Sequence, residues 1–319
     1  MTGAHAPSDL LAAAREGDRV ALARLLTAIE NDPAAARAIA PATWTARRGY
    51  AVGVTGAPGA GKSTLTDRLV AGALARADAD REPATVGVLC VDPSSPLSGG
   101  AILGDRVRMQ GHATDARVFI RSLASRGHLG GLSVAVPDAL AALAAAGFDR
   151  VYVETVGVGQ VELEVAATAD VTCVVVPAGW GDAMQAAKAG LLEVADVFVV
   201  NKADRPGATE ARRDLEQMLD LGTSRDDGWR PPVLETVATE GTGVDAVLDA
   251  LEAFRAAQAG AVADRRRRDR ARRLLARLVA DRAARSVEEL VGSGRFDAAV
   301  RRVGSGELDP YTAVDGLVE

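Results

Sequence analysis

The chain has 319 residues, of which 48% are apolar and 25% are charged, and its formal net charge is −6. A chain of this length and apolar content buries a sizeable core, while its acidic balance excludes the broad basic surface that nucleic-acid-binding domains usually present. We therefore expect one large globular domain with smaller helical additions, and no nucleic-acid partner.

The chain opens with a segment whose apolar side chains recur at helical spacing over residues 8–29. Ser8 and Asp9 are the predicted N-caps of this helical segment, which we assign to residues 1–45. The N-terminus has no basic stretch followed by an apolar run, and no apolar run reaches the roughly 18 residues of a membrane span. A cytoplasmic protein without a membrane segment is expected.

From Tyr50 onward, short valine-rich runs alternate with alanine-rich amphipathic stretches. Continuous apolar runs separated by helices indicate parallel strands that are buried on both faces. The predicted fold class is therefore α/β, a three-layer sandwich with a mostly parallel sheet over residues 46–255. Cys90 and Cys173 lie inside two of these runs and are predicted to be buried strand thiols rather than ligands or nucleophiles. The predicted strands are residues 50–56, 85–92, 116–122, 149–157, 171–177, 196–202 and 231–237.

The first predicted strand leads into GAPGAGKST, which fits the phosphate-loop pattern G-x-x-x-x-G-K-[ST] of P-loop NTPases and precedes a predicted helix. Its glycines let backbone N–H groups converge on phosphate oxygens at the N-terminus of that helix. Lys62 is expected to bind the β and γ phosphates, Ser63 to coordinate Mg²⁺ and Thr64 to reach the α phosphate. An incidental glycine-rich turn is the alternative, which the strand, loop and helix order disfavours. The predicted nucleotide-binding residues here are Ala57, Pro58, Gly59, Ala60, Gly61, Lys62, Ser63 and Thr64.

A second motif, NKAD at residues 201–204, follows a later apolar run and predicts that the bound base is guanine. The Asp204 carboxylate can accept hydrogen bonds from guanine N1–H and the exocyclic amine, which adenine does not offer. Asn201 is expected to bond another edge of the base and to tie this loop to the phosphate loop, while the Lys202 stem covers a base face. Val237 stands where GTPases usually have a serine, which leaves the Ala238 N–H for the guanine oxygen.

Acidic residues end two further predicted strands, where α/β sheets present groups to their ligands. Asp92 ends one of them, and Glu154 begins ETVG, which resembles the D-x-x-G element of GTPases. Such an acid holds magnesium directly or through water, and the Gly157 N–H is expected to meet the γ phosphate. Helix capping is the alternative role for both acids. Asp105, in a glycine-rich segment, is expected to hold magnesium or position water. The predicted catalytic residues are thus Lys62, Asp92, Asp105 and Glu154, and the predicted metal ligands are Ser63, Asp92, Asp105 and Glu154.

The predicted strands stop after about Phe254, and the rest of the chain has a helical pattern. The leucines, valines and alanines of this region recur at helical spacing and form aliphatic stripes that need a partner surface. The run Arg265–Arg268 is either a solvated face or a binding site for an anionic ligand or partner. We assign residues 256–319 to a C-terminal helical segment that contributes to dimerisation.

Several long motifs together resemble one known family, the methylmalonyl-CoA-mutase-associated GTPases of the MeaB or ArgK type. The motifs are GAPGAGKST, VDPSSPLSGGAILGDRVRM, SRGHLGG, AGFDRVYVETVGVGQVE and VVNKAD, and the resemblance runs from about residue 45. It implies a homodimeric P-loop GTPase of the SIMIBI class that converts GTP to GDP and phosphate. It further implies a chaperone that gates adenosylcobalamin loading and protects an acyl-CoA mutase such as methylmalonyl-CoA mutase.

The resemblance also implies an additional switch loop in the segment PAGWGDAMQAAKAG. Asp182, Gln185 and Lys188 match the polar positions of the family's loop, whereas Trp180 and Ala183 depart from it. These three residues are the predicted partner contacts.

Two other functions stay open at this stage. A GTPase that matures nickel enzymes usually carries clustered histidine or cysteine ligands, whereas His5, His112 and His128 are scattered here. A small-molecule kinase would share the phosphate loop, but the NKAD motif argues against it. Mg²⁺ and GTP or GDP are the ligands expected under the GTPase hypotheses.

Overall fold

The computed structural model describes residues 5–46, 49–80, 84–92, 109–112, 114–124, 135–155, 161–179, 194–222, 227–258 and 260–318. The chain divides into two compact units, Met1–Ala259 and Gly260–Glu319. The division lies slightly beyond residue 256, because helix α10 (Val244–Ala257) packs against the sheet of the first unit through Leu251 and Phe254. The N-terminal helices belong to the same unit as the sheet, since their leucines share one of its cores.

The described part of the first unit contains one seven-stranded sheet, in the order β3-β2-β4-β1-β5-β6-β7. Each of its strand pairs is parallel. Every predicted strand is present, with ends displaced by at most two residues, because the valine-rich runs are buried on both faces of the sheet. The strands are β1 Tyr50–Gly56, β2 Val86–Asp92, β3 Val118–Ala124, β4 Arg150–Thr155, β5 Val171–Pro177, β6 Val197–Asn201 and β7 Val233–Thr236.

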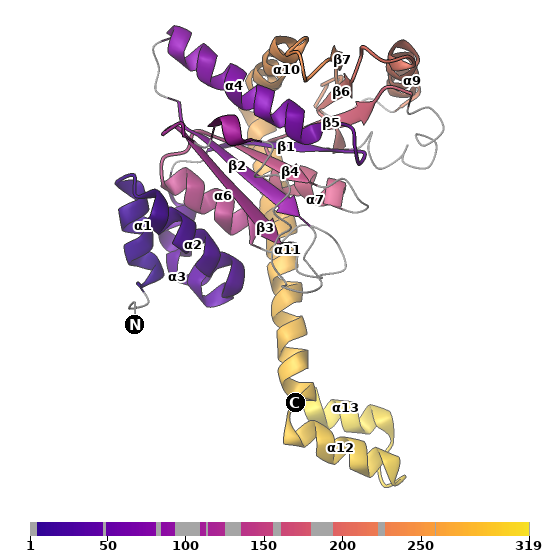
Figure 1. Cartoon of the computed structure of the whole chain (residues 1–319). Helices are drawn as coiled ribbons and strands as arrows, with labels where there is room; N and C mark the ends of the chain where they lie inside the picture. The colour runs from indigo at the N-terminus through magenta and orange to yellow at the C-terminus, as the bar shows by residue number, and fades with distance from the viewer. Residues whose placement is uncertain are drawn as a thin grey trace. The chain divides into compact units, whose positions relative to one another are not determined.

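Helices cover both faces of the sheet, which makes the three-layer arrangement predicted from the sequence (Figure 1). On one face, α4 (Lys62–Asp80) and α10 pack against side chains such as Val54 and Tyr152. The opposite face is covered by α6 (Val136–Ala145), α7 (Val161–Thr168) and α9 (Ala208–Leu221). Successive strand residues point to opposite faces, so each continuous apolar run supplies both cores.

Both cysteines are buried in central strands and carry no disulfide. Burial raises the pKa of the Cys173 thiol to about 12, so this thiol stays protonated at neutral pH. The prediction that Cys90 and Cys173 are buried strand thiols is therefore confirmed. No described helix combines the length and the apolar character needed to cross a bilayer.

Three helices precede the sheet in the described part of the chain, α1 (Pro7–Arg15), α2 (Arg19–Asn31) and α3 (Pro33–Trp44). The predicted caps Ser8 and Asp9 are wrong, because α1 begins at Pro7 and the N-cap residue is Ala6, without a side-chain hydrogen bond. Proline suits the first helical position, since its φ is already helical and its missing N–H is not needed there. Asp18 is the cap of α2 and accepts hydrogen bonds from Val20 N (2.8 Å) and Ala21 N (3.0 Å).

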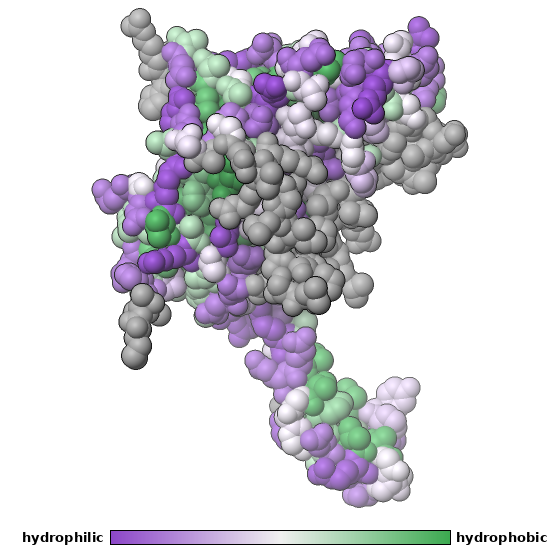
Figure 2. Space-filling model, in the orientation of Figure 1, coloured by the Kyte–Doolittle hydropathy of each residue, from purple (hydrophilic) through white to green (hydrophobic). Residues whose placement is uncertain are grey.

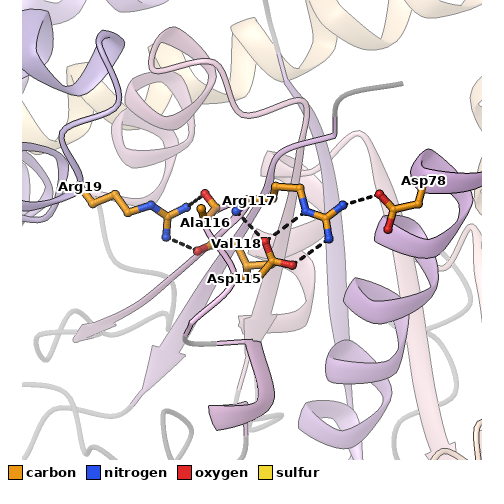
Figure 3. Close-up of polar contacts among 6 residues, drawn as sticks. All are labelled: Arg19, Asp78, Asp115, Ala116, Arg117 and Val118. Atoms are coloured by element: carbon orange, nitrogen blue, oxygen red, sulfur yellow. Dashed lines mark hydrogen bonds and ion pairs between the residues drawn. The ribbon is translucent and has the colours of Figure 1, made fainter. Parts of the chain in front are cut away.

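Arginines attach two helices to the segment that enters the edge strand β3 (Figure 3). Arg19 of α2 donates to the carbonyl oxygens of Ala116 and Val118. Arg117 forms ion pairs with Asp115 at 2.8 Å and with Asp78 of α4 at 2.6 Å. The Arg117 guanidinium holds the pKa of Asp115 down to about 2, so this pair persists at all but strongly acidic pH.

The second unit consists of helices α11 (Ala261–Val291), α12 (Gly294–Gly304) and α13 (Pro310–Val318). Arg265, Arg267 and Arg268 of the arginine run are exposed on α11. Large apolar side chains are exposed as well, and green surface lies among purple surface on these helices in Figure 2. The exposed apolar residues of this unit are Leu275, Leu278, Val279, Val287, Val291, Val300, Tyr311, Val314 and Val318.

One half-buried acid in the first unit gives a prediction about stability and pH. Asp138 of α6 accepts a hydrogen bond from Trp44 Nε1 at 3.1 Å, and burial raises the pKa of this carboxyl group. Because the folded pKa exceeds the unfolded one, ionisation of Asp138 costs stability as the pH rises above the unfolded pKa of about 4. Asp138→Asn keeps an acceptor for Trp44 and removes the charge. We expect its Tm at pH 8 to equal or exceed that of the wild type, with a smaller difference at pH 5.

Thermal unfolding followed by Trp fluorescence measures this effect, and Asp138→Ala is the matched control. Alanine leaves the Trp44 N–H without its acceptor, so we expect Asp138→Ala to lower the free energy of unfolding by about 1 kcal/mol. A lower Tm for Asp138→Asn than for the wild type at pH 8 would contradict the argument.

Candidate functional site

The phosphate loop joins β1 to α4 by a backbone path that excludes side chains at two positions. Gly56 has φ 126°, and a Cβ atom there would lie 2.0 Å from the Val175 carbonyl oxygen. Gly61 has φ 90°, and its Cβ atom would lie 2.4 Å from Asn201 Nδ2. Only glycine fits both positions, because the conformation is left-handed and the neighbouring strands are in contact. The loop is thus packed against β5 and β6, at the carboxyl ends of the strands.

Lys62 is the first residue of α4, and its side chain is 6% exposed. Its Nζ donates hydrogen bonds to Gly56 O at 2.9 Å and Ala57 O at 3.0 Å. The ammonium group is therefore held over the loop, next to the N-terminal backbone N–H groups of α4. A helix N-terminus with an adjacent cation favours an anion such as phosphate.

Oxygen ligands gather beside the phosphate loop. Ser63 Oγ donates to Glu154 Oε1 at 2.5 Å, across 91 residues of sequence, and both side chains are buried. Glu154 of β4 is paired with Cys90 of β2, and Asp92 lies two residues further along β2, so Asp92 and Glu154 point to the same face of the sheet. A hydroxyl with two carboxylates is the donor set that a hard cation such as Mg²⁺ prefers. The residues present therefore fit a magnesium ion.

Asn201, at the end of β6, joins the phosphate loop to the loop that follows β7. Its Nδ2 donates to Ala60 O at 2.8 Å, and its Oδ1 accepts from Thr236 Oγ1 at 3.0 Å and Ala238 N at 3.1 Å. The residue is 2% exposed, so these hydrogen bonds lie in the protein interior. Asn201 thus places the two loops relative to each other.

The remaining NKAD residues extend from the end of β6 toward solvent. Lys202 Nζ donates to Gly59 O at 2.7 Å, and its backbone has φ 61°, an uncommon conformation for a residue with a side chain. Asp204, two residues beyond Lys202, is exposed and lies outside the protein core. The Ala203 N–H donates to Thr236 O at 3.0 Å and fixes this turn to β7. Base recognition by Lys202 and Asp204 stays a prediction.

The sequence analysis missed two features that the fold brings to this site. Thr55 and Thr155 share a buried hydrogen bond of 2.9 Å between their hydroxyl groups, at the ends of the adjacent strands β1 and β4. Arg68 of α4 contacts the loop after β7, donating to Ala238 O at 3.1 Å and Thr239 O at 2.8 Å. No motif names Arg68, and its partners lie about 170 residues away, so local spacing carries no signal for this contact.

Other predicted site residues lie outside the described part of the chain. They are Asp105, Gly157, Asp182, Gln185 and Lys188. Within the described ranges, no group of three or more His, Cys, Asp or Glu side chains is placed to hold a metal ion.

Comparison with known proteins identifies the chain. Residues 22–290 match the family described as methylmalonyl Co-A mutase-associated GTPase MeaB. The chain belongs to this family. It is accordingly a GTPase, and its three-layer fold with a phosphate loop is the fold of the P-loop NTPases.

Individual relatives agree with the MeaB-type assignment. A protein of Pyrococcus horikoshii named as a GTPase is 44% identical over 322 residues, which cover 98% of this chain and 97% of the relative. A fused isobutyryl-CoA mutase of Cupriavidus metallidurans is 40% identical over 206 residues, which cover 64% of this chain and 18% of the mutase. The crystal structure of a LAO/AO transport system kinase superposes with a TM-score of 0.70 at 28% identity and covers 100% of this chain and 98% of that structure.

The central place of Asn201 in this MeaB-type site gives a testable prediction. Asn201→Ala removes the partners of Ala60 O and the Ala238 N–H inside the protein, and each buried polar group left unsatisfied costs about 1–3 kcal/mol. We expect the free energy of unfolding to fall by about 2–4 kcal/mol in urea titrations, together with weaker GDP binding. Thr236→Val removes one of the three hydrogen bonds and should lower the free energy of unfolding by a smaller amount. Equal stability of Asn201→Ala and wild type would refute the role.

Proposed function

We propose that this MeaB-type GTPase controls an adenosylcobalamin-dependent acyl-CoA mutase, gating cofactor loading and protecting the enzyme from inactivation. Membership of a family described by its association with methylmalonyl-CoA mutase carries the proposal. The match to a segment of a fused isobutyryl-CoA mutase supports it, because a GTPase of this kind and a mutase then share one polypeptide.

The nucleotide is proposed to be GTP, held by its phosphates at the loop between β1 and α4. Lys62 would bind the β and γ phosphates and Thr64 the α phosphate, while Asn201, Lys202 and Asp204 would bind the guanine. The position of the Lys62 ammonium beside the α4 N-terminus supports the first role. The Asn201 hydrogen bonds support the last, since they fix the base-side loop to the phosphate loop.

Magnesium is proposed to bind beside the same phosphates. Ser63, Asp92 and Glu154 would hold the ion directly or through water, with Asp105 as a further ligand. The buried Ser63–Glu154 contact supports this set, because it gathers hard oxygen donors next to the phosphate loop. When bound, the ion would neutralise charge that develops on the phosphates during hydrolysis.

The control step is proposed to be a switch that follows the γ phosphate. Gly157, which lies two residues beyond the last residue of β4 in the sequence, would donate its N–H to that phosphate. Asp182, Gln185 and Lys188, which follow β5 in the sequence, would contact the mutase. Loss of the γ phosphate removes the partner of the Gly157 N–H, so the surface offered to the mutase changes with hydrolysis.

A nucleotide-dependent capture experiment tests the proposal. The wild type is immobilised with a non-hydrolysable GTP analogue or with GDP, and extracts of the native cell are passed over it. We expect an acyl-CoA mutase among the retained proteins, in an amount that differs between the two nucleotides, and no such difference with Lys62→Ala. Purified mutase is then loaded with adenosylcobalamin in the presence of each form. Retention of no mutase with either nucleotide, or loading that ignores the GTPase, would reject the function.

The second unit is proposed to join two copies of the chain. Its helices expose the apolar side chains described above, among them Tyr311 at 84% exposure, which favours burial against a partner surface. We expect a chain ending at Gln258 to be monomeric by light scattering and the full-length protein to be a dimer. Val300→Glu with Val314→Glu should also dissociate the dimer while leaving the first unit folded. A truncated chain that remains dimeric would contradict this prediction.

A further inference from the structure

Arg68 makes a two-point contact between α4 and the loop after β7. The residue lies on the second turn of α4, five positions beyond Ser63. Its Nε donates to Ala238 O at 3.1 Å and its Nη2 donates to Thr239 O at 2.8 Å. The planar guanidinium thus binds two successive carbonyl groups, and such charged donors form stronger hydrogen bonds than neutral ones.

The loop that Arg68 contacts is short and fixed at both ends. Val237 pairs with Thr242 in an isolated bridge, and the Val237 N–H donates to Thr242 O at 3.0 Å. Gly243 closes the loop with φ 77°, and a Cβ atom there would lie 2.1 Å from Glu235 O. These contacts fix the two ends of the loop, and the placement of the residues between them depends on the groups that hold Ala238 and Thr239.

Ala238 is held from two sides. Its N–H donates to Asn201 Oδ1 from β6, and its carbonyl group accepts from Arg68 of α4. Val237 and Ala238 have no polar side-chain atoms, so at these two positions the loop can recognise a base only through its main chain. The position of the main chain therefore decides how well the loop meets guanine O6. This oxygen is next to the N1–H that Asp204 is proposed to bind.

We propose that Arg68 is a positioning residue for guanine recognition, which holds the Ala238–Thr239 backbone so that the main-chain N–H donors of this loop, that of Ala238 being shared with Asn201 Oδ1, meet guanine O6. The inference rests on the proposed guanine-binding role of the NKAD motif. Arg68 acts through the loop and does not itself touch the base. Its removal should therefore weaken binding of those bases that carry an oxygen at position 6, and spare a base that lacks it.

A matched control lies on the same helix. Arg76 also reaches from α4 to a neighbouring element, donating to Asp245 O at 3.0 Å and pairing with Asp249 at 2.7 Å. Both of its partners belong to α10, and Arg76 itself lies about two helical turns beyond Arg68 along α4. Arg76→Ala thus removes an equal charge and a contact between α4 and another element, at residues that lie outside the loop after β7.

The test uses three nucleoside diphosphates, so that hydrolysis does not interfere. GDP carries both O6 and the exocyclic amine, IDP carries O6 alone, and 2-aminopurine riboside diphosphate carries the amine alone. Their dissociation constants are measured by equilibrium dialysis for wild type, Arg68→Ala, Arg68→Lys and Arg76→Ala. Thermal unfolding of each variant verifies its fold, and Arg68→Lys, which keeps the charge and one donor, serves as the milder variant.

We expect Arg68→Ala to bind GDP and IDP about 5–30-fold more weakly, the factor for 1–2 kcal/mol, and 2-aminopurine riboside diphosphate within about twofold of wild type. Arg68→Lys should recover part of the loss, and Arg76→Ala should bind all three like wild type. An equal loss for all three bases would show a general effect of charge or structure and overturn the inference, as would no loss at all.

A parallel titration of Asp204→Asn distinguishes a failure of the inference about Arg68 from a failure of the proposed guanine site. If Asp204→Asn leaves GDP binding unchanged, the guanine site itself is misassigned and the inference falls with it. If Asp204→Asn weakens GDP binding while Arg68→Ala acts equally on all bases, only the role of Arg68 is rejected.

Discussion

Lys62→Ala is expected to abolish GTP hydrolysis and to weaken nucleotide binding. The ammonium group is held at the start of the phosphate loop by Gly56 O and Ala57 O, next to the N-terminus of α4. It is the group proposed to neutralise charge on the β and γ phosphates as the bond to the γ phosphate breaks. Loss of one preorganised stabilising group of this kind lowers kcat by about 100-fold to 1,000-fold. Phosphate release and GDP titration measure the two effects.

Arg213→Ala is a suitable control for the Lys62 variant, because it removes one positive charge from the exposed face of α9. It should hydrolyse GTP at the wild-type rate. The wild-type rate itself is expected to be slow, since no glutamine or arginine finger is placed by the sequence. Full activity of Lys62→Ala would remove the phosphate site from consideration, and fast hydrolysis by the isolated wild type would contradict the expected need for a partner.

Asp204→Asn is expected to change the base preference of the protein from guanine to xanthine. The carboxylate is proposed to accept from guanine N1–H and the exocyclic amine, and the amide replaces one acceptor by a donor. A donor facing the guanine amine loses a hydrogen bond, whereas xanthine carries an oxygen there and gains one. We expect GTP affinity to fall by about 2–4 kcal/mol while the affinity for xanthosine nucleotides rises.

Titrations with GDP and xanthosine diphosphate decide this prediction without interference from hydrolysis. Asp204→Ala serves as the control, because it should lose GDP affinity without gaining xanthine. The exposed position of Asp204 makes both variants compatible with the fold. Undiminished GDP binding by Asp204→Asn would reject Asp204 as the group that reads the base.

Local sequence was sufficient for the strands and for the phosphate loop. The valine-rich runs become parallel strands because a run that is apolar at every position is stable only where both faces are covered, as in β5, whose residues from Val171 to Val176 are buried. The phosphate loop could be predicted because its strand, glycines and helix are contiguous in the chain. Gly56 and Gly61 do have the left-handed backbone that only glycine readily adopts.

Contacts between distant segments could be predicted only where a motif supplied them. The N-K-x-D pattern led to the expectation that Asn201 joins two loops, and the hydrogen bond to Ala60 O does so. The start of α1 was mistaken because Ser8 and Asp9 are residue types that often cap helices, yet Pro7 begins the helix one residue earlier. A propensity for capping is a local tendency that a neighbouring proline overrides.

The sequence by itself thus determined the element types, the phosphate loop and the guanine-type motif, because each depends on residues close together in the chain. Only the tertiary structure decided that β1 lies between β4 and β5, which brings Glu154 to Ser63. It alone brought Arg68 of α4 to the loop after β7. Strand order and the approach of a helix to a distant loop are set by the packing of whole faces, and the periodicity of a single segment carries no information about which segment will become its neighbour.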